Sequence, residues 1–479
     1  MHFNSLEFFL FFTVVYITYL FLSLRWQNRM LIAASCLFYA AWNWKFLFLM
    51  AASISTDFWC SQQIDRTDDP KKRKTFLLIS LFINLGILGF FKYYNFFIAN
   101  IQGLLSCLHL ASPTLDLTLK IILPLGISFY TFEAMSYIID VYKRKIRPAQ
   151  NYWDYFLFVI YFPHLIAGPI MRAKDFLPQI IAPRLVNANK YYNGAYLVFL
   201  GLFQKMFVAD NMAKIVNPIF NDGTGHNGAD FLISMYAFTF QIFGDFAGYS
   251  NMARGLGAMM GFEITINFNT PFFAVNVQDF WNRWHISLSH WIRDYLYLPL
   301  MGGFRRINGN ARIYLALMVS MTLIGLWHGA AWNFVFFGIY YGVLLSFYLF
   351  IRICWANLIV PKSPWGIRFW FWLRVLFIFH LTVFGMMIFR CHSLSQIGDI
   401  IRALLKNFHP SAMNNENFTA LIGFATPLML LQWVEYRTND IFFILKYHWA
   451  LRSFLLAVLT YLLLGWGVMK AEEFIYFQF

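Results

Sequence analysis

A series of long apolar segments constrains this chain more than any other feature of its sequence. A helix needs roughly 17–20 residues to cross a bilayer. Segments near or beyond that length are Phe8–Leu24, Phe76–Phe91, Ile313–Ile351 and Phe454–Met469, and the third contains no Asp, Glu, Lys or Arg. The longest polar pieces, about 61–75 and 406–418, suffice only for loops. The pattern predicts an all-α polytopic membrane protein, with one membrane domain over residues 1–479 and no separate soluble domain.

The charge of the chain indicates membrane topology and argues against a nucleic-acid partner. The net charge is +14, yet only 13% of residues are charged and 59% are hydrophobic. The basic residues cluster between apolar segments, at Arg66–Lys74 and Lys143–Arg147, which is typical of cytoplasmic loops. Arg25 and Arg29 follow the first segment, so the N-terminus is expected outside. It has no basic start or small-residue cleavage site, and therefore does not read as a removable signal peptide.

Two segments are expected to differ from simple crossings. Residues 153–170 have basic flanks and contain Pro163, Gly168 and Pro169, which favours a re-entrant segment; a short kinked span is the alternative. Residues 276–300 are too polar to face lipid and are expected as a helix buried in the bundle or lying at the interface.

Two short spans are expected to be joined by a turn near Trp42–Lys45. The other expected spans are 76–97, 121–141, 193–218, 230–250, 313–328, 332–351, 368–389, 419–435 and 450–469.

The first catalytic candidate is the sequence Trp327-His328-Gly329-Ala330-Ala331-Trp332. Polar groups inside membrane segments are costly, and are therefore functional candidates. As a neutral imidazole, His328 can accept a proton from a hydroxyl group near pH 7. Gly329 permits close approach, and Trp327 and Trp332 are expected to wall a dry substrate pocket. A structural histidine bonded to a carbonyl group is the alternative.

The second candidate, His285, lies in a polar segment. At about 100° per helical residue, His285 shares a face with Ser289, whereas His290 is turned away and is expected in packing or at the surface. The spacing excludes an i,i+4 metal pair, there is no H-E-x-x-H motif, and the five cysteines form no C-x-x-C pair, so no metal is expected. The residues expected near His285 to bind substrate or support the site are Asn282, Arg283 and Ser289.

A third polar position, Asp245, ends an apolar segment and needs a partner. We expect a structural ion pair with Arg254 or Arg283, in preference to a catalytic role. Gly255 and Gly257 do not follow a strand and lack dinucleotide-loop spacing, so they are expected to permit close helix packing.

These motifs together resemble the bacterial branch of the membrane-bound O-acyltransferase family, which contains the alginate O-acetylation, peptidoglycan O-acetylation and D-alanyl-teichoic-acid transfer membrane proteins. The resemblance runs nearly end to end. It rests on Ser35–Trp42, Phe91–Phe96, Leu123–Phe132, Phe162–Pro169, Trp281–Ser289, Trp327–Gly329, Phe389-Arg390 and Phe474–Phe479. Two positions differ from many relatives, which have Gln where this chain has Glu133 and His164; these differences are expected to alter the pocket lining.

The resemblance implies a bundle of about eleven membrane helices with re-entrant segments and a central funnel. It places the invariant family histidine at His328 and the second motif histidine at His285. It also implies a bacterial cytoplasmic (inner) membrane location and a surface-side acyltransferase or relay protein as partner. No tightly bound cofactor is expected. The implied donor is a cytoplasmic acyl thioester, either acetyl-CoA or an acyl carrier protein.

We therefore expect an O-acyltransferase in which His328 acts as general base on the acceptor hydroxyl, and His285 orients the acceptor or stabilises the oxyanion. Acetyl is the expected acyl group, and a surface polysaccharide such as alginate the eventual acceptor. The alternatives are D-alanyl transfer to teichoic acid, acylation of a protein or lipid, and a non-enzymatic channel for a small group. The absence of a sequence repeat and the single His-Gly motif argue against the channel.

Overall fold

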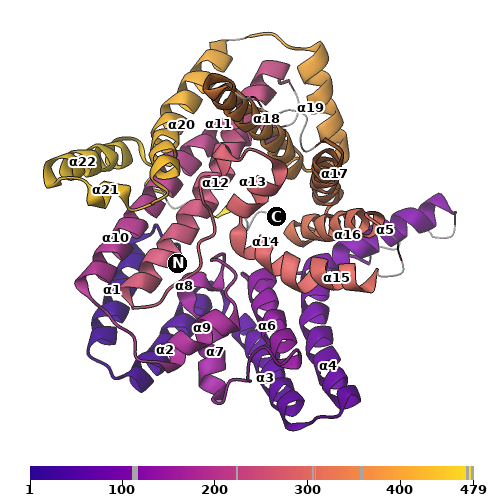
Figure 1. The fold of residues 1–479 in the computed structure, drawn as a ribbon, viewed down its shortest axis with the longest axis vertical. Coiled ribbons are helices and arrows are strands. Elements are labelled where there is room, and N and C mark those ends of the chain that lie inside the picture. The colour runs from indigo at the N-terminus through magenta and orange to yellow at the C-terminus, as the bar shows by residue number, and fades with distance from the viewer. Residues whose placement is uncertain are drawn as a thin grey trace. The chain divides into compact units, whose positions relative to one another are not determined.

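A computed structural model describes residues 1–109, 117–222, 225–304, 307, 309–355, 361, 363–410, 412–470 and 474–475. All regular secondary structure in these ranges is helical (Figure 1). Seven helical segments are long and apolar enough to cross a membrane: Pro70–Cys107, Gly228–Met259, Ala311–His328, Trp332–Cys354, Pro364–Arg390, Met413–Thr438 and Trp449–Trp466. The chain is thus an all-α, multi-pass membrane protein. Two compact units can be distinguished, Met1–Tyr192 with Leu256–Thr265, and Asn193–Gly255 with Ile266–Phe479.

The first unit contains the N-terminal helices. The expected turn near Trp42–Lys45 is present, because one helix ends at Asn43 and the next begins at Lys45. The helices are α1 (Leu6–Leu20), α2 (Leu24–Asn43), α3 (Lys45–Arg66), α4 (Pro70–Leu88), the π-helical segment η1 (Gly89–Tyr93), α5 (Tyr94–Cys107), α6 (Ile127–Tyr142), α7 (Tyr152–Ile160), α8 (Phe162–Leu165) and α9 (Ala173–Ile181).

The helix expected over 121–141 is shorter than predicted and begins only at Ile127. Gly126 precedes it in the left-handed region, at φ +72°. A Cβ atom at this position would lie 2.5 Å from the carbonyl oxygen of Leu165, so both the backbone conformation and the close approach require glycine. The preceding Pro124 also disfavours a helix across this stretch.

The segment expected to be re-entrant consists of two short helices, α7 and α8. They are separated at Tyr161, and Pro163 lies in the first turn of α8. The nine residues of α7 span about 14 Å, roughly half of a hydrocarbon layer. Neither helix is long enough to cross a bilayer alone.

Polar side chains in the interior connect α3, α4 and α6. The Asp57 carboxylate accepts hydrogen bonds from Ser80 Oγ at 2.5 Å and Asn84 Nδ2 at 2.8 Å. Ser61 Oγ and the Tyr137 hydroxyl lie 2.9 Å apart. These contacts turn the polar faces of α3 and α4 inward, which leaves apolar side chains on their outer faces.

The second unit contains the remaining helices; α10 (Ala188–Leu202) and α12 (Gly228–Met259) each contribute residues to both units. The others are η2 (π-helical, Phe203–Ala209), α11 (Asp210–Asp222), η3 (Pro271–Phe273), α13 (Val277–Arg283), α14 (Ile286–Ile292), η4 (π-helical, Arg293–Tyr297), α15 (Leu298–Gly303), α16 (Ala311–His328), α17 (Trp332–Trp355), α18 (Pro364–Arg390), α19 (Leu394–Lys406), α20 (Ala412–Thr438), α21 (Phe443–Lys446) and α22 (Trp449–Trp466).

Glycines bring α12 close to α10 and η2. A Cβ atom added at Gly255 would lie 2.5 Å from the carbonyl oxygen of Gly194, and one added at Gly248 would lie 2.8 Å from that of Gly201. The expectation that Gly255 permits close helix packing is thus confirmed.

Candidate functional site

His328 is the last residue of α16, where the chain turns into α17. The two helices pack closely because a Cβ atom at Gly325 would overlap the carbonyl oxygen of Phe334, and one at Gly329 would overlap the Phe334 ring. The buried imidazole is enclosed by aromatic rings. Its centroid lies 5.0 Å from Trp327, 5.9 Å from Phe337 and 5.2 Å from Phe389.

His285 lies at a break between two short helices. The expectation of one continuous helix over 276–300 is wrong: α13 ends at Arg283, Trp284 is extended, and α14 begins at Ile286. His285 itself has φ +45° and ψ +52°, a conformation that non-glycine residues rarely adopt. Helical phase therefore does not explain its direction.

The extended segment around Asn267 satisfies the main chain at this break. Asn269 N donates to the Arg283 carbonyl oxygen at 2.9 Å, and Ile286 N donates to the Asn267 carbonyl oxygen at 2.9 Å. Because the main-chain groups on both sides of the break have hydrogen-bond partners, His285 is held in its left-handed conformation.

The His285 ring is fully buried and has polar and aromatic contacts. Its Nδ1 lies 3.1 Å from Asn267 Oδ1, and Phe246 packs against it edge-on at a centroid distance of 4.6 Å. Burial lowers the pKa of His285 to about 3, so the ring is neutral at physiological pH. Asn267 and Phe246 had no distinguishing pattern in the sequence.

Trp327 brings the two histidines into one cluster. Its ring centroid lies 6.1 Å from that of His285 and 5.0 Å from that of His328. Trp327 is buried, as expected for the wall of a dry pocket, whereas the Trp332 side chain is 53% exposed and does not share that burial.

A cavity of about 420 Å³ lies beside these elements, within the usual range for small-molecule sites. Of the five residues predicted to bind substrate, Asn282 and Ser289 line it. His290, expected in packing or at the surface, is exposed and also lines it. Arg283 does not, because its Nε binds the Asp279 carboxylate at 2.9 Å. Trp327 and Trp332 are not among the lining residues either.

The cavity follows one face of the α16–α17 hairpin towards the histidine cluster. Its α16 wall runs from Ile313 to Ile324, which is one helical turn before His328. Arg293 and Arg352 line it as well, and both are exposed. Ser320 also lines it, and among the described residues its buried hydroxyl has no hydrogen-bond partner. The cavity thus combines an apolar wall with cationic and hydroxyl groups.

Asp245 forms the expected structural ion pair, but not with the expected partner. Lys205 Nζ lies 2.7 Å from Asp245 and 2.8 Å from Asp210, and all three side chains are buried. The main-chain N of Ile475 also donates to Asp245 at 2.6 Å. Lys205 was not among the predicted partners, although a charge within the apolar stretch 193–218 is the kind of signal that could have identified it.

Glu133 and His164, the two positions expected to differ from relatives, lie together in the first unit. His164 Nδ1 is 3.1 Å from Glu133 Oε1, and Met171 N donates to the same carboxylate oxygen at 2.8 Å. Both side chains are buried. Within the described residues, their contacts connect α6 to α8 and to the chain that follows it.

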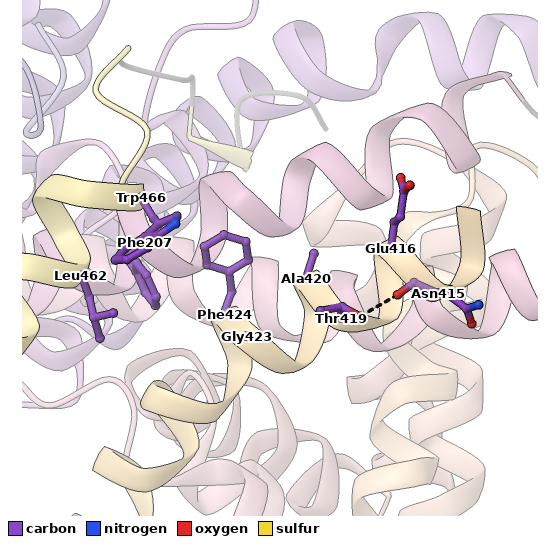
Figure 2. A pocket seen from close by; sticks show the side chains of 9 residues that line it. All are labelled: Phe207, Asn415, Glu416, Thr419, Ala420, Gly423, Phe424, Leu462 and Trp466. Carbon is purple, nitrogen blue, oxygen red and sulfur yellow. Dashed lines mark hydrogen bonds between the residues drawn. The ribbon is translucent and has the colours of Figure 1, made fainter. Parts of the chain in front are cut away.

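A second hollow, of about 640 Å³, lies along α20 and α22 (Figure 2). It is polar at Asn415 and Glu416 and apolar towards Phe424 and Trp466. None of the residues predicted for the site lines it. In the described part of the chain, no group of three or more His, Cys, Asp or Glu residues is arranged to hold a metal ion.

Comparison with known proteins connects this cluster to one family. The model of the membrane-bound O-acyltransferase family matches residues 143–388, which include both histidines. The probable alginate O-acetylase AlgI of Pseudomonas aeruginosa is 36% identical over 403 residues, 83% of this chain and 74% of the relative. The peptidoglycan O-acetyltransferase of Helicobacter pylori is 35% identical over 346 residues, 66% and 63% of the two chains. The teichoic acid D-alanyltransferase of Bacillus subtilis is 31% identical over 276 residues, 55% and 68% of the two chains.

Proposed function

This chain belongs to the membrane-bound O-acyltransferase family, and we propose that it moves an acetyl group across the membrane. The donor is a cytoplasmic thioester, and the acetyl group passes towards hydroxyl groups of a cell-surface polysaccharide such as alginate. We place this reaction in the bacterial cytoplasmic membrane. The supporting relatives are an alginate O-acetylase and a peptidoglycan O-acetyltransferase, both named for acetyl transfer to polymers.

The main support for the proposed chemistry is that two buried histidines, His285 and His328, pack against the indole ring of Trp327. A cavity with both apolar and polar lining residues lies beside them. In the proposed mechanism, His328 removes the proton of the acceptor hydroxyl group while the hydroxyl oxygen attacks the thioester carbonyl carbon. The tetrahedral intermediate then collapses, the carbon–sulfur bond breaks, and the thiolate takes the proton from His328. His285 orients the acceptor or stabilises the oxyanion.

The cavity beside α16 and α17 supports a route for the donor. Arg352 lies in the last turn of α17, and because basic residues are in excess on cytoplasmic loops, we infer that this end of α17 faces the cytoplasm. A thioester carrier has an anionic phosphate and an extended, partly apolar arm. In our proposal Arg293 and Arg352 bind the phosphate, while the apolar wall guides the acyl group towards His328.

A relay protein on the outer surface completes the proposed function. A long polysaccharide requires an extended polar groove for recognition, whereas the described surface of this chain consists largely of apolar helices. A surface-side acyltransferase that receives the acyl group would supply such a groove.

The test is transfer by the purified protein in proteoliposomes. Acetyl-CoA, acetylated carrier protein and D-alanylated carrier protein would be supplied on the Arg352 side, with and without a candidate surface-side partner. We expect thiol release from an acetylated donor, and polysaccharide acetylation only when the partner is present. Consumption of the D-alanyl donor alone would favour the activity of the teichoic acid relatives. Efficient polysaccharide acetylation without any partner would contradict the relay.

A further inference from the structure

The hydrogen bonds around Asn267 determine which nitrogen of His285 carries its hydrogen. Asn267 is buried, and its side-chain oxygen has three neighbours. Ser287 N lies at 3.2 Å, Ser287 Oγ at 2.9 Å and His285 Nδ1 at 3.1 Å. On the other side of the amide, Asn267 Nδ2 donates to Ser250 Oγ at 3.2 Å.

The backbone contact fixes the orientation of the Asn267 amide. A main-chain N–H group only donates, so the atom opposite Ser287 N is the amide oxygen and not the nitrogen. An amide oxygen only accepts, so Nδ1 of His285 must be the donor in its contact with the same atom. In a neutral imidazole, the second nitrogen, Nε2, then has the lone pair.

We propose that Asn267 is a positioning residue that holds His285 as the Nδ1–H tautomer and thereby makes its buried Nε2 a hydrogen-bond acceptor. The part of this inference that concerns the reaction rests on the proposed function: His285 then orients the acceptor hydroxyl by accepting its hydrogen bond. A neutral ring of this tautomer has no Nε2 hydrogen to donate to an oxyanion. The tautomer itself does not depend on the reaction.

The neighbouring contacts favour a neutral ring. Asn267, Phe246 and Trp327 surround His285, and none of these side chains titrates. His328, which packs against the same indole, is a titratable group beside this cluster. Because burial disfavours the imidazolium, His285 is expected to keep Nε2 unprotonated at mildly acidic pH.

Three variants separate positioning from a structural role. Asn267→Leu removes the acceptor at similar size, and Asn267→Asp keeps an oxygen opposite Nδ1. Asn269→Leu changes an exposed residue of the same segment and serves as the control. Loss of the correct tautomer costs about 10⁴-fold in kcat in serine proteases. For Asn267→Leu we expect kcat to fall by about 10²-fold or more, with KM little changed. Asn267→Asp should retain most activity at neutral pH, and Asn269→Leu all of it.

The pH profile gives a readout that a structural role would not change. A carboxylate opposite Nδ1 stabilises the imidazolium and raises the pKa of His285. As the pH falls through that raised value, Nε2 gains a proton and stops accepting. The Asn267→Asp variant should therefore lose activity in mildly acidic buffer, where the unmodified protein retains it.

The direct measurement is the ¹⁵N spectrum of histidine-labelled protein, with the His285 signals assigned by their loss in His285→Gln. We expect a protonated Nδ1 and an unprotonated Nε2. A protonated Nε2 in the unmodified protein would overturn the proposal, as would full activity of a folded Asn267→Leu variant. If Asn267→Leu does not fold, the ¹⁵N spectrum of the unmodified protein and the pH–activity profile of Asn267→Asp still test the proposal. If the expected tautomer is present but no acyl donor is consumed, the proposed function fails and the positioning by Asn267 stands.

Discussion

At the scale of single residues, the site depends on histidines placed by neighbours that are distant in sequence. His328 contacts Phe389 on α18, and His285 is bonded to Asn267, eighteen positions earlier in the chain. Aromatic rings pack around both imidazoles, and exclusion of water from such a site strengthens electrostatic contacts within it.

The first prediction concerns His328. Replacement by alanine removes the proposed general base, a group whose loss costs about 10² to 10⁴ in rate. His328→Ala should abolish surface O-acylation while the protein still accumulates in the membrane, as measured by ester content and by immunoblot. Substantial acylation by the well-folded variant would exclude His328 as the base.

The second prediction compares His285 with His290. His285→Ala should disable transfer, because the buried ring contacts both Asn267 and Trp327. His290→Ala should be milder than His285→Ala, because this exposed side chain lines the proposed donor cavity but has no role in the proposed proton transfer or acceptor orientation. Transfer rates of the two purified variants at matched protein levels provide the measurement. The opposite ranking would show that the polar segment presents His290 to the reacting groups.

At the level of helices, two departures from regular geometry, the π-helical segment η2 and the break at His285, coincide with buried polar groups. The π-helical segment η2 contains Lys205, and Asp210 follows it directly. Such segments recur at functional sites, because the added residue redirects side chains that a regular helix would point elsewhere. In this chain, the segment η2 places Lys205 within ion-pair distance of both Asp210 and Asp245, which are far apart in sequence.

The third prediction tests this ion pair. Lys205→Met leaves two buried carboxylates without their shared cation, and breaking a buried pair in this way costs about 3–5 kcal/mol. The variant should show a clearly lower melting temperature in detergent. Lys214→Met provides the control, because Lys214 is exposed and bonds only to Asn211 in the contacts described. Equal melting temperatures for both variants would show that Lys205 is not needed for stability.

At the scale of the whole molecule, contacts within the first unit place two basic loops side by side. Arg144 forms an ion pair with Asp68 at 2.5 Å, and Arg73 donates to the Tyr142 carbonyl oxygen at 2.7 Å. The loops around 66–74 and 143–147 therefore lie on the same side of that unit. This agrees with the prediction that both are cytoplasmic.

The fourth prediction concerns topology. In a cysteine-free background, single cysteines at Lys71 and Lys145 should be shielded from an impermeant thiol reagent added to whole cells, and should react after lysis. A cysteine at Ser112, which lies outside the described residues, should react in whole cells. Labelling at Lys145 without labelling at Ser112 would reverse the orientation.

The amino-acid sequence was enough to predict the membrane class and most of the crossing segments, and it singled out both histidines as candidates. Long apolar segments have no stable alternative to helices in lipid, because every backbone polar group must be satisfied within the segment. A histidine within such a segment is costly enough to stand out from its apolar neighbours. The re-entrant stretch was expected from its basic flanks and from Pro163, Gly168 and Pro169.

Only the tertiary structure decided how those residues are arranged. The break at His285 depends on main-chain hydrogen bonds of its flanking residues to Asn267 and Asn269, and no helical period encodes such pairing. Lys205 replaced the expected arginines as partner of Asp245, because an ion pair is chosen by proximity in space. Trp327 and Trp332 belong to one short motif, yet only Trp327, in the last turn of α16, is buried, whereas Trp332, the first residue of α17, is exposed. Local sequence determines which segments enter the membrane, whereas packing between distant segments determines which polar side chains meet.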